Sequence, residues 1–133
     1  AAQEPDFIKA NTPLSKLDLL VCDHYERGFS FETACRPWVD QILVIEDLPN
    51  RSHDADILLD QTFGRDHAEY DGQLPKGCLL LTGPAFALLG SEFKKLRPKA
   101  ISRRLGPVER VLVCVGGGNP HDILSKIINH FKC

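Results

Sequence analysis

Short apolar runs of strand length recur along the chain, and longer stretches in which apolar residues follow a helical spacing separate them. The runs that predict strands are Leu17–Cys22, Ile42–Ile45, Ile57–Leu59, Cys78–Leu81 and Val111–Val115. Continuous apolar runs of this kind are typical of the strands of parallel sheets. Their alternation with helices predicts an α/β fold built on a Rossmann-like parallel sheet.

The stretches between the runs predict helices of different lengths. In Phe29–Val39, the residues that fall on one helical face are Phe31, Ala34, Cys35 and Trp38. This helix is expected to end near Pro37, and Phe86–Phe93 predicts a short helix or a single helical turn. The last helix has on one face Ile123, Leu124, Ile127, Ile128 and Phe131.

A basic stretch divides the chain in two. Six of the 16 Lys and Arg residues fall between Lys94 and Arg104, together with Pro98, which predicts a solvated linker over residues 94–109. Residues 1–93 and 110–133 are then expected to belong to different domains.

The composition is that of a globular protein, with 43% hydrophobic and 26% charged residues. The net charge of −2 provides no basic field that would attract nucleic acid or an anionic membrane. No apolar run approaches the roughly 18 residues that span a bilayer, and the first residues lack the pattern of a signal peptide. Because the sequence contains no Met, we expect a processed, recombinant or partial chain.

The five cysteines are odd in number, widely spaced and without a C-x-x-C pair. This pattern favours neither a disulfide framework nor a zinc site. Cys22, Cys78 and Cys114 lie inside or beside apolar runs, where a buried thiol acts as a small hydrophobic side chain. We therefore expect a reducing compartment, the cytoplasm.

Ligands of open α/β sheets bind at the carboxyl ends of the strands, so the residues after each run are candidates for chemistry. Residues 23–27 (DHYER) follow the first run. His24 could act as a general acid or base, and Tyr25 could donate a hydrogen bond to a substrate or leaving group. The alternative is a plain strand-ending turn in which Asp23 caps a helix and His24 is solvated.

Residues 46–56 follow the second run and combine several carboxylates with His53. Their spacing matches no H-x-x-x-H or EF-hand pattern, so no metal is expected. Arg51 could contact a phosphate, although a polar loop with turn residues accounts for most of this stretch.

Gly116, Gly117, Gly118 and Asn119 follow the last run and precede the final helix. Glycines let the backbone approach a phosphate closely, and amides at the start of a helix attract its charge. Neither G-x-G-x-x-G nor G-K-[ST] is present, so the dinucleotide and P-loop signatures do not apply. A tight strand-to-helix turn without a ligand explains these glycines almost as well.

Four segments together resemble successive motifs of one bacterial enzyme family. They are DHY at residues 23–25, LVIEDLPNRSHDADILLDQTFG at 43–64, GPAFALLGSEF at 83–93 and VCVGGGNP at 113–120. In this order they resemble the UDP-sugar hydrolases of the pseudaminic acid pathway and their relatives in spore-coat and other surface polysaccharide biosynthesis. The resemblance runs from about Leu17 to Phe131, and residues 47–61 are its most specific part.

The resemblance implies part of a glycosyltransferase-B-like architecture, in which the nucleotide sugar lies between two Rossmann-like domains. It implies hydrolysis of UDP-diacetamido-trideoxy-altropyranose by attack of water at the anomeric carbon, with release of UDP and without a metal or other cofactor. By position, the glycine turn and Asn119 would bind UDP. Tyr25 would line the sugar site, with His24 and Tyr25 as the candidate catalytic residues.

By position, residues 1–93 would be the later part of an N-terminal domain, and residues 110–133 would be the first strand, turn and helix of a C-terminal nucleotide-binding domain.

The sequence also departs from the pattern of this family. The presumed catalytic base of the family is a His in a G-x-G-H-x-x-R segment, expected upstream of Ala1. We therefore expect an internal fragment with little or no activity alone. Phe86 stands where Tyr is usual, and Gly90 where Arg is usual.

Two alternatives stay open. The first is a related glycosyltransferase, which would transfer the sugar to an acceptor. The second is a non-catalytic binding module, which would keep the fold but have an eroded site, and the changes at Phe86 and Gly90 favour it.

Beyond the UDP-sugar, we expect no nucleic-acid partner and no membrane insertion. We also expect self-association through the exposed face of the last helix, at Ile123, Ile127 and Phe131.

Overall fold

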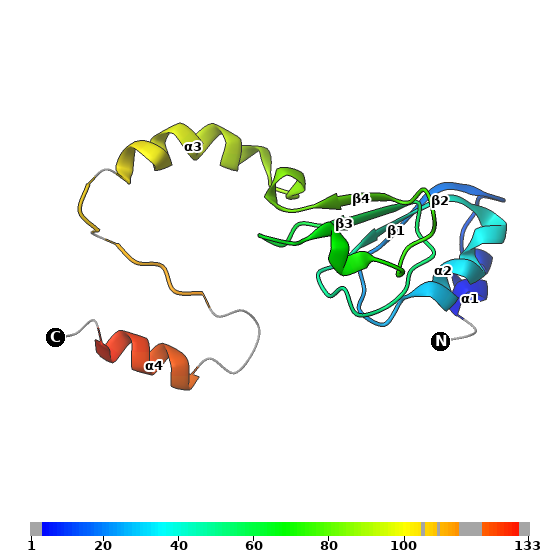
Figure 1. Cartoon of the computed structure of the whole chain (residues 1–133), viewed down its shortest axis with the longest axis horizontal. Coiled ribbons are helices and arrows are strands. Elements are labelled where there is room, and N and C mark those ends of the chain that lie inside the picture. The colour runs from blue at the N-terminus through cyan, green and yellow to red at the C-terminus, as the bar shows by residue number, and fades with distance from the viewer. Residues whose placement is uncertain (1–3, 105, 109, 115–120, 131–133) are drawn as a thin grey trace. The chain divides into compact units, whose positions relative to one another are not determined.

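The computed structural model describes residues 4–104, 106–108, 110–114 and 121–130. The chain divides into two compact units, Ala1–Leu89 and Gly90–Cys133, and each is considered by itself (Figure 1). Within the described ranges, none of the helices combines the length and the apolar character needed to cross a membrane.

The first unit is built on a four-stranded sheet in which every pair of neighbouring strands is parallel (Figure 1). The strands, in both chain order and sheet order, are β1 (Leu17–Cys22), β2 (Val39–Ile45), β3 (Ile57–Asp60) and β4 (Leu79–Thr82). Leu58 at the centre pairs with Val44 on one side and Leu80 on the other. The predicted α/β fold with a Rossmann-like parallel sheet is confirmed.

Short helices connect and cover these strands. They are α1 (Glu4–Ala10), α2 (Phe29–Cys35) and the 3-10 helices η1 (Arg36–Trp38), η2 (His67–Tyr70) and η3 (Pro84–Phe86). The helix predicted over Phe29–Val39 therefore ends at Cys35 as an α-helix. Pro37 lies in η1, because proline has no N–H with which to continue the α-helical hydrogen bonds.

The apolar face predicted for this helix is only partly right. Cys35 and Trp38 are buried and Phe31 is half-buried, but Ala34 is exposed. Glu32 is fully buried instead. A carboxylate is accommodated there because it accepts hydrogen bonds from the loop between β2 and β3.

Most of the hydrophobic core lies on one face of the sheet, although Leu59 on the opposite face is also buried. The buried members of this main cluster are Cys22, Cys35, Trp38, Val39, Ile42, Val44, Ala55, Leu58 and Tyr70. On the opposite face Leu19, Val21 and Leu79 are 45%, 52% and 54% exposed. The apolar run Leu17–Cys22 predicts a buried strand, but β1 is covered on one face only, because side chains alternate between the faces and the helices of this unit pack on the other face.

The cysteine thiols differ in their burial. Burial raises the pKa of Cys22 and of Cys35 to about 11, so both act as small hydrophobic side chains. Cys78 is half-buried, whereas Cys114, expected to be buried, is exposed.

In the second unit, α3 (Ser91–Arg103) occupies most of the segment predicted as a linker over residues 94–109. The segment is solvated as expected, since no residue of α3 is buried, but it is helical rather than irregular. Residues with high helix propensity surround Pro98 and outweigh its cost. The helix or turn predicted over Phe86–Phe93 is also shifted, because α3 begins only at Ser91. The domain boundaries themselves stay predictions.

In the described residues after Arg104, only the last helix agrees with the prediction from the sequence. Val111–Cys114 form no strand, because no neighbouring strand pairs with them in the described residues, so the strand predicted over Val111–Val115 is wrong there. The predicted helix is present as α4 (His121–His130). Of the face expected to self-associate, Ile123 is exposed, Ile127 is half-buried and Phe131 lies outside the described residues. Self-association through this face stays a prediction.

Candidate functional site

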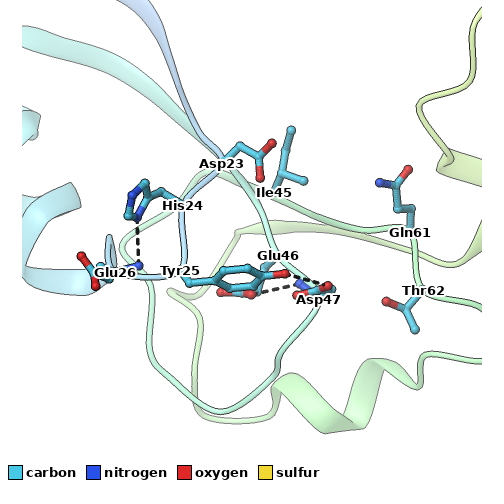
Figure 2. Close-up of a pocket in the computed structure, with 9 residues that line it drawn as sticks. All are labelled: Asp23, His24, Tyr25, Glu26, Ile45, Glu46, Asp47, Gln61 and Thr62. Atoms are coloured by element: carbon cyan, nitrogen blue, oxygen red, sulfur yellow. Dashed lines mark hydrogen bonds between the residues drawn. The ribbon is translucent and has the colours of Figure 1, made fainter. Parts of the chain in front are cut away.

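The carboxyl ends of β1, β2 and β3 surround a pocket of about 610 Å³ (Figure 2). The residues that line it are Asp23, His24, Tyr25 and Glu26 after β1, Ile45, Glu46 and Asp47 at the end of β2, and Gln61 and Thr62 after β3. This edge is where open α/β sheets bind their ligands. The pocket therefore contains both His24 and Tyr25, which the sequence had singled out.

His24 has a defined arrangement of donor and acceptor atoms. Its Nδ1 accepts a hydrogen bond from the backbone N–H of Glu26 at 3.1 Å (Figure 2). A neutral imidazole has one donor and one acceptor nitrogen, so the proton of neutral His24 lies on Nε2. In this geometry His24 offers a ligand a hydrogen-bond donor, whereas a general base would need a free lone pair on Nε2.

Tyr25 connects the first two loops of the pocket. Its exposed hydroxyl donates a hydrogen bond to Asp47 Oδ2 at 3.1 Å (Figure 2). This hydrogen bond, and then the charge of Asp47, raises the pKa of Tyr25 above its usual value. Tyr25 therefore remains a neutral phenol near physiological pH.

Glu46 directly follows β2 and has a fully buried side chain. Its Oε1 accepts hydrogen bonds from the amides of Asp47 at 2.9 Å and Leu48 at 3.1 Å, and its Oε2 accepts one from Arg51 Nε at 2.8 Å. Burial by itself raises the pKa of Glu46, but these hydrogen bonds outweigh burial and lower it. Glu46 is thus a fixed carboxylate that orders its loop, and Arg51 binds this carboxylate rather than lining the pocket.

His53 lies in a buried cluster of ionisable groups. Its Nδ1 is 2.7 Å from Glu32 Oε1, and its Nε2 is 3.4 Å from Glu46 Oε2. None of these three side chains is exposed, so the cluster joins α2 to the loop after β2. Within the described part of the chain, no group of three or more His, Cys, Asp or Glu residues is arranged to hold a metal ion.

Asp60, the last residue of β3, is a buried carboxylate like Glu46 after β2. Its Oδ1 accepts a hydrogen bond from the amide of Thr62 at 2.9 Å, and its Oδ2 accepts bonds from the Tyr70 hydroxyl at 2.9 Å and from Arg65 Nε. Burial alone raises the pKa of Asp60, but these hydrogen bonds give a net lowering. Asp60 is therefore a buried carboxylate that fixes Thr62 beside the pocket.

Polar and apolar groups both remain at this edge for a ligand. Gln61 Oε1 accepts a hydrogen bond from the amide of Leu88 at 2.9 Å, which holds the loop after β4 near the pocket. Leu48 and Phe63 follow the polar residues of their loops, and Phe63 is 88% exposed. Neither residue lines the pocket, whose lining is polar except for Ile45 and the ring of Tyr25 and therefore suits a ligand with several hydrogen-bonding groups.

Acid is expected to destabilise the fold through Glu46, Asp54 and Asp60. In each of these residues hydrogen bonds outweigh burial and hold the folded pKa below the ordinary value, 4.5 for Glu and 3.8 for Asp. The unfolded chain then binds more protons, so the free energy of unfolding rises with pH. This stability is present above the ordinary pKa values and is lost as pH falls through the lowered ones.

Urea unfolding followed by circular dichroism checks this expectation. The urea midpoint should stay level from about pH 7 to about pH 5 and fall steeply below about pH 4. The exposed Asp18 provides a control, because Asp18→Asn should leave this profile unchanged. An equal midpoint at about pH 3 and about pH 7 would contradict the role of the three carboxylates.

Sequence reasoning placed His24 and Tyr25 at the pocket but did not single out Asp47, Gln61 or Thr62. The signal that could have found them is their position directly after the second and third apolar runs. The catalytic roles of His24 and Tyr25 stay predictions.

The residues expected to bind UDP lie outside the described residues: Gly116, Gly117, Gly118 and Asn119. Comparison of the chain with models of known protein families found no match, and a search of curated proteins also found none.

Proposed function

We propose that this chain belongs to a bacterial nucleotide-sugar hydrolase of the kind its sequence resembles, and that the pocket at the carboxyl edge of the sheet holds the sugar. The supporting observation is the convergence of donors and acceptors from three successive loops, on Tyr25, Asp47, Gln61 and Thr62. The hydroxyl and acetamido groups of a diacetamido-trideoxy-hexose need such a mixed set. A pocket of about 610 Å³ is within the usual range of small-molecule sites.

The proposed reaction breaks the bond between the anomeric carbon and a diphosphate oxygen. The oxygen of water forms the new bond at that carbon, UDP leaves with the electron pair, and the proton that the water loses passes to the solvent. We assign His24 and Tyr25 to holding the sugar, because His24 presents an N–H donor and the Tyr25 phenol is neutral. A donor on His24 would also stabilise negative charge that develops on the leaving group.

The diphosphate is assigned to the glycine turn and Asn119, on the sequence pattern alone. The proposed setting is bacterial surface polysaccharide biosynthesis in the cytoplasm. The free thiols of Cys22, Cys35 and Cys78 are compatible with a reducing compartment.

The proposal is tested by adding UDP-diacetamido-trideoxy-altropyranose, and separately UDP, to the ¹⁵N-labelled chain. The UDP-sugar is expected to shift the amide signals of Tyr25, Asp47 and Thr62, and UDP alone to leave them in place. Thr62→Ala should weaken binding of the UDP-sugar by roughly fivefold, since a lost hydrogen bond costs about 1 kcal/mol. Thr12→Ala is the matched control, because Thr12 does not line the pocket. Equal affinities of the two variants would contradict the proposal.

A non-catalytic nucleotide-sugar-binding module is the second candidate. Two polar side chains of the pocket, Glu46 and His24, already accept hydrogen bonds from main-chain amides and so are not free bases. An assay for UDP release by the full-length parent protein separates the candidates, because little or no activity is expected of this chain alone. Release of UDP supports the hydrolase, whereas binding of the UDP-sugar without release supports the module.

A further inference from the structure

The loops after β2 and β3 share a pattern that the proposed function does not use. In each loop a carboxylate is followed five positions later by an arginine, and the pairs are Glu46 with Arg51 and Asp60 with Arg65. Both carboxylate side chains are fully buried, and the arginine side chains are 24% and 12% exposed. Neither arginine lines the pocket.

Arg51 links the end of β2 to the loop after β1. Its Nε donates to Glu46 Oε2 at 2.8 Å, and its Nη2 contacts the same oxygen. The Nη2 also donates to the main-chain oxygen of His24 at 3.3 Å. One guanidinium therefore connects a buried carboxylate to the backbone of the preceding loop.

Arg65 makes the same connection one strand further along the sheet. Its Nε donates to Asp60 Oδ2, and its Nη2 donates to the main-chain oxygen of Asp47 at 2.6 Å. Its Nη1 donates to Glu69 Oε2 at 2.6 Å. The end of β3 is thus connected to the loop after β2, so the three pocket loops are joined in sheet order.

We infer that Arg51 and Arg65 are positioning residues that set the spacing of the three pocket loops and hold Tyr25 within hydrogen-bond distance of Asp47. The guanidinium is planar and presents several donors in fixed directions, so it can bind a carboxylate and a carbonyl at once. Lysine keeps the charge but lacks this geometry. The inference concerns the shape of the pocket and applies to any ligand that binds there.

A second buried pair lies beside Glu46 and Arg51. His53 Nδ1 is 2.7 Å from Glu32 Oε1 on α2, and His53 Nε2 is 3.4 Å from Glu46 Oε2. The second contact is not a hydrogen bond, and His53 Nε2 has no hydrogen-bond partner among the described residues. Glu46 is therefore held by Arg51 and by the amides of its own loop.

The phenol of Tyr25 reports on this spacing, because its hydrogen bond to Asp47 raises its pKa. Burial, and then Asp60, raises the pKa of Tyr70 much further, so Tyr25 is the first of the two tyrosines to ionise. A near-ultraviolet titration follows this ionisation in the full chain. Asp47→Asn defines the complete loss of the shift, and we expect Arg51→Lys and Arg65→Lys to lower the pKa of Tyr25 most of the way to that value.

Two control variants separate positioning from a general loss of stability. Arg97→Lys on the exposed helix α3 should titrate as the unmodified chain does. Val39→Ala weakens the core at the first residue of β2, at the end of that strand opposite the pocket, so it should lower the urea midpoint and leave the pKa of Tyr25 unchanged. If Arg51→Lys and Arg65→Lys behave as Val39→Ala does, the arginines are merely structural and the inference is overturned.

A measurement on the unmodified chain covers the case in which these variants do not fold. The Nε–H protons of Arg51 and Arg65 should exchange with water at least roughly tenfold more slowly than that of Arg97, because they are engaged in part-buried hydrogen bonds. Nitrogen-detected NMR of the arginine side chains measures these rates. Equal exchange at the three arginines would overturn the inference.

Discussion

Replacing Asp60 by alanine is expected to destabilise the first unit by about 3–5 kcal/mol, the usual cost of removing one partner from a buried ion pair. The change removes the acceptor of Arg65, of the Tyr70 hydroxyl and of the Thr62 amide. Arg65 and Tyr70 would keep the cost of burial without its compensation. Domains of this size are typically stable by only about 5–15 kcal/mol, so the loss is a large part of the total.

Urea unfolding of the Asp60→Ala variant, followed by circular dichroism, measures this effect. Asp18→Ala is the matched control, because Asp18 is exposed on β1 and its removal should change the free energy of unfolding by less than about 0.5 kcal/mol. Asp60→Asn should fall between the two, since the amide oxygen can still accept from Thr62. A cost below about 1 kcal/mol for Asp60→Ala would show that the network contributes little to stability.

Leu58→Ala is expected to cost about 2–5 kcal/mol by opening a cavity in the core. Leu58 is fully buried at the centre of the sheet, beside Val44 on β2 and Leu80 on β4. Leu58 belongs to the main core cluster, and the structure around such a residue relaxes only partly when the side chain is removed. Chemical unfolding of the variant measures the cost directly.

The open face of the sheet provides the control for this variant. Leu79 is 54% exposed, so Leu79→Ala should cost much less than Leu58→Ala. Leu58→Met should cost less than about 1.5 kcal/mol, because it nearly conserves volume. Equal costs for Leu79→Ala and Leu58→Ala would mean that Leu79 is covered in solution and would contradict the exposure of this face at β4.

The strands were predictable because an apolar run of strand length is a local property of the sequence. The run Leu17–Cys22 coincides with β1, and Ile57–Leu59 falls within β3. The run at Val111–Cys114 shows the limit of this rule, because a strand also needs a neighbour and none pairs with it in the described residues. The exposure of Leu19 and Val21 could not be predicted from the sequence either, because it depends on which elements pack against the sheet.

The position of the pocket was predictable from the parallel strands, because their carboxyl ends meet at one edge. On that basis His24 and Tyr25 were singled out after the first run. The partners of these residues were not, since the hydrogen bond from Tyr25 to Asp47 joins positions that are distant in sequence. The repeated spacing of a carboxylate and an arginine can be read from the sequence. The role of each arginine cannot, because it depends on a hydrogen bond to a main-chain oxygen of the preceding loop.

The sequence by itself determined the class of the fold and the edge at which polar residues gather, because periodicity and the order of strands are encoded locally. Only the tertiary structure decided which of these polar residues are buried supports and which face a ligand. Glu46 and Asp60 are buried beside arginines, whereas Tyr25 and Asp47 stay exposed. The physical reason is that a carboxylate becomes a buried support only where distant segments bring it enough donors to replace water.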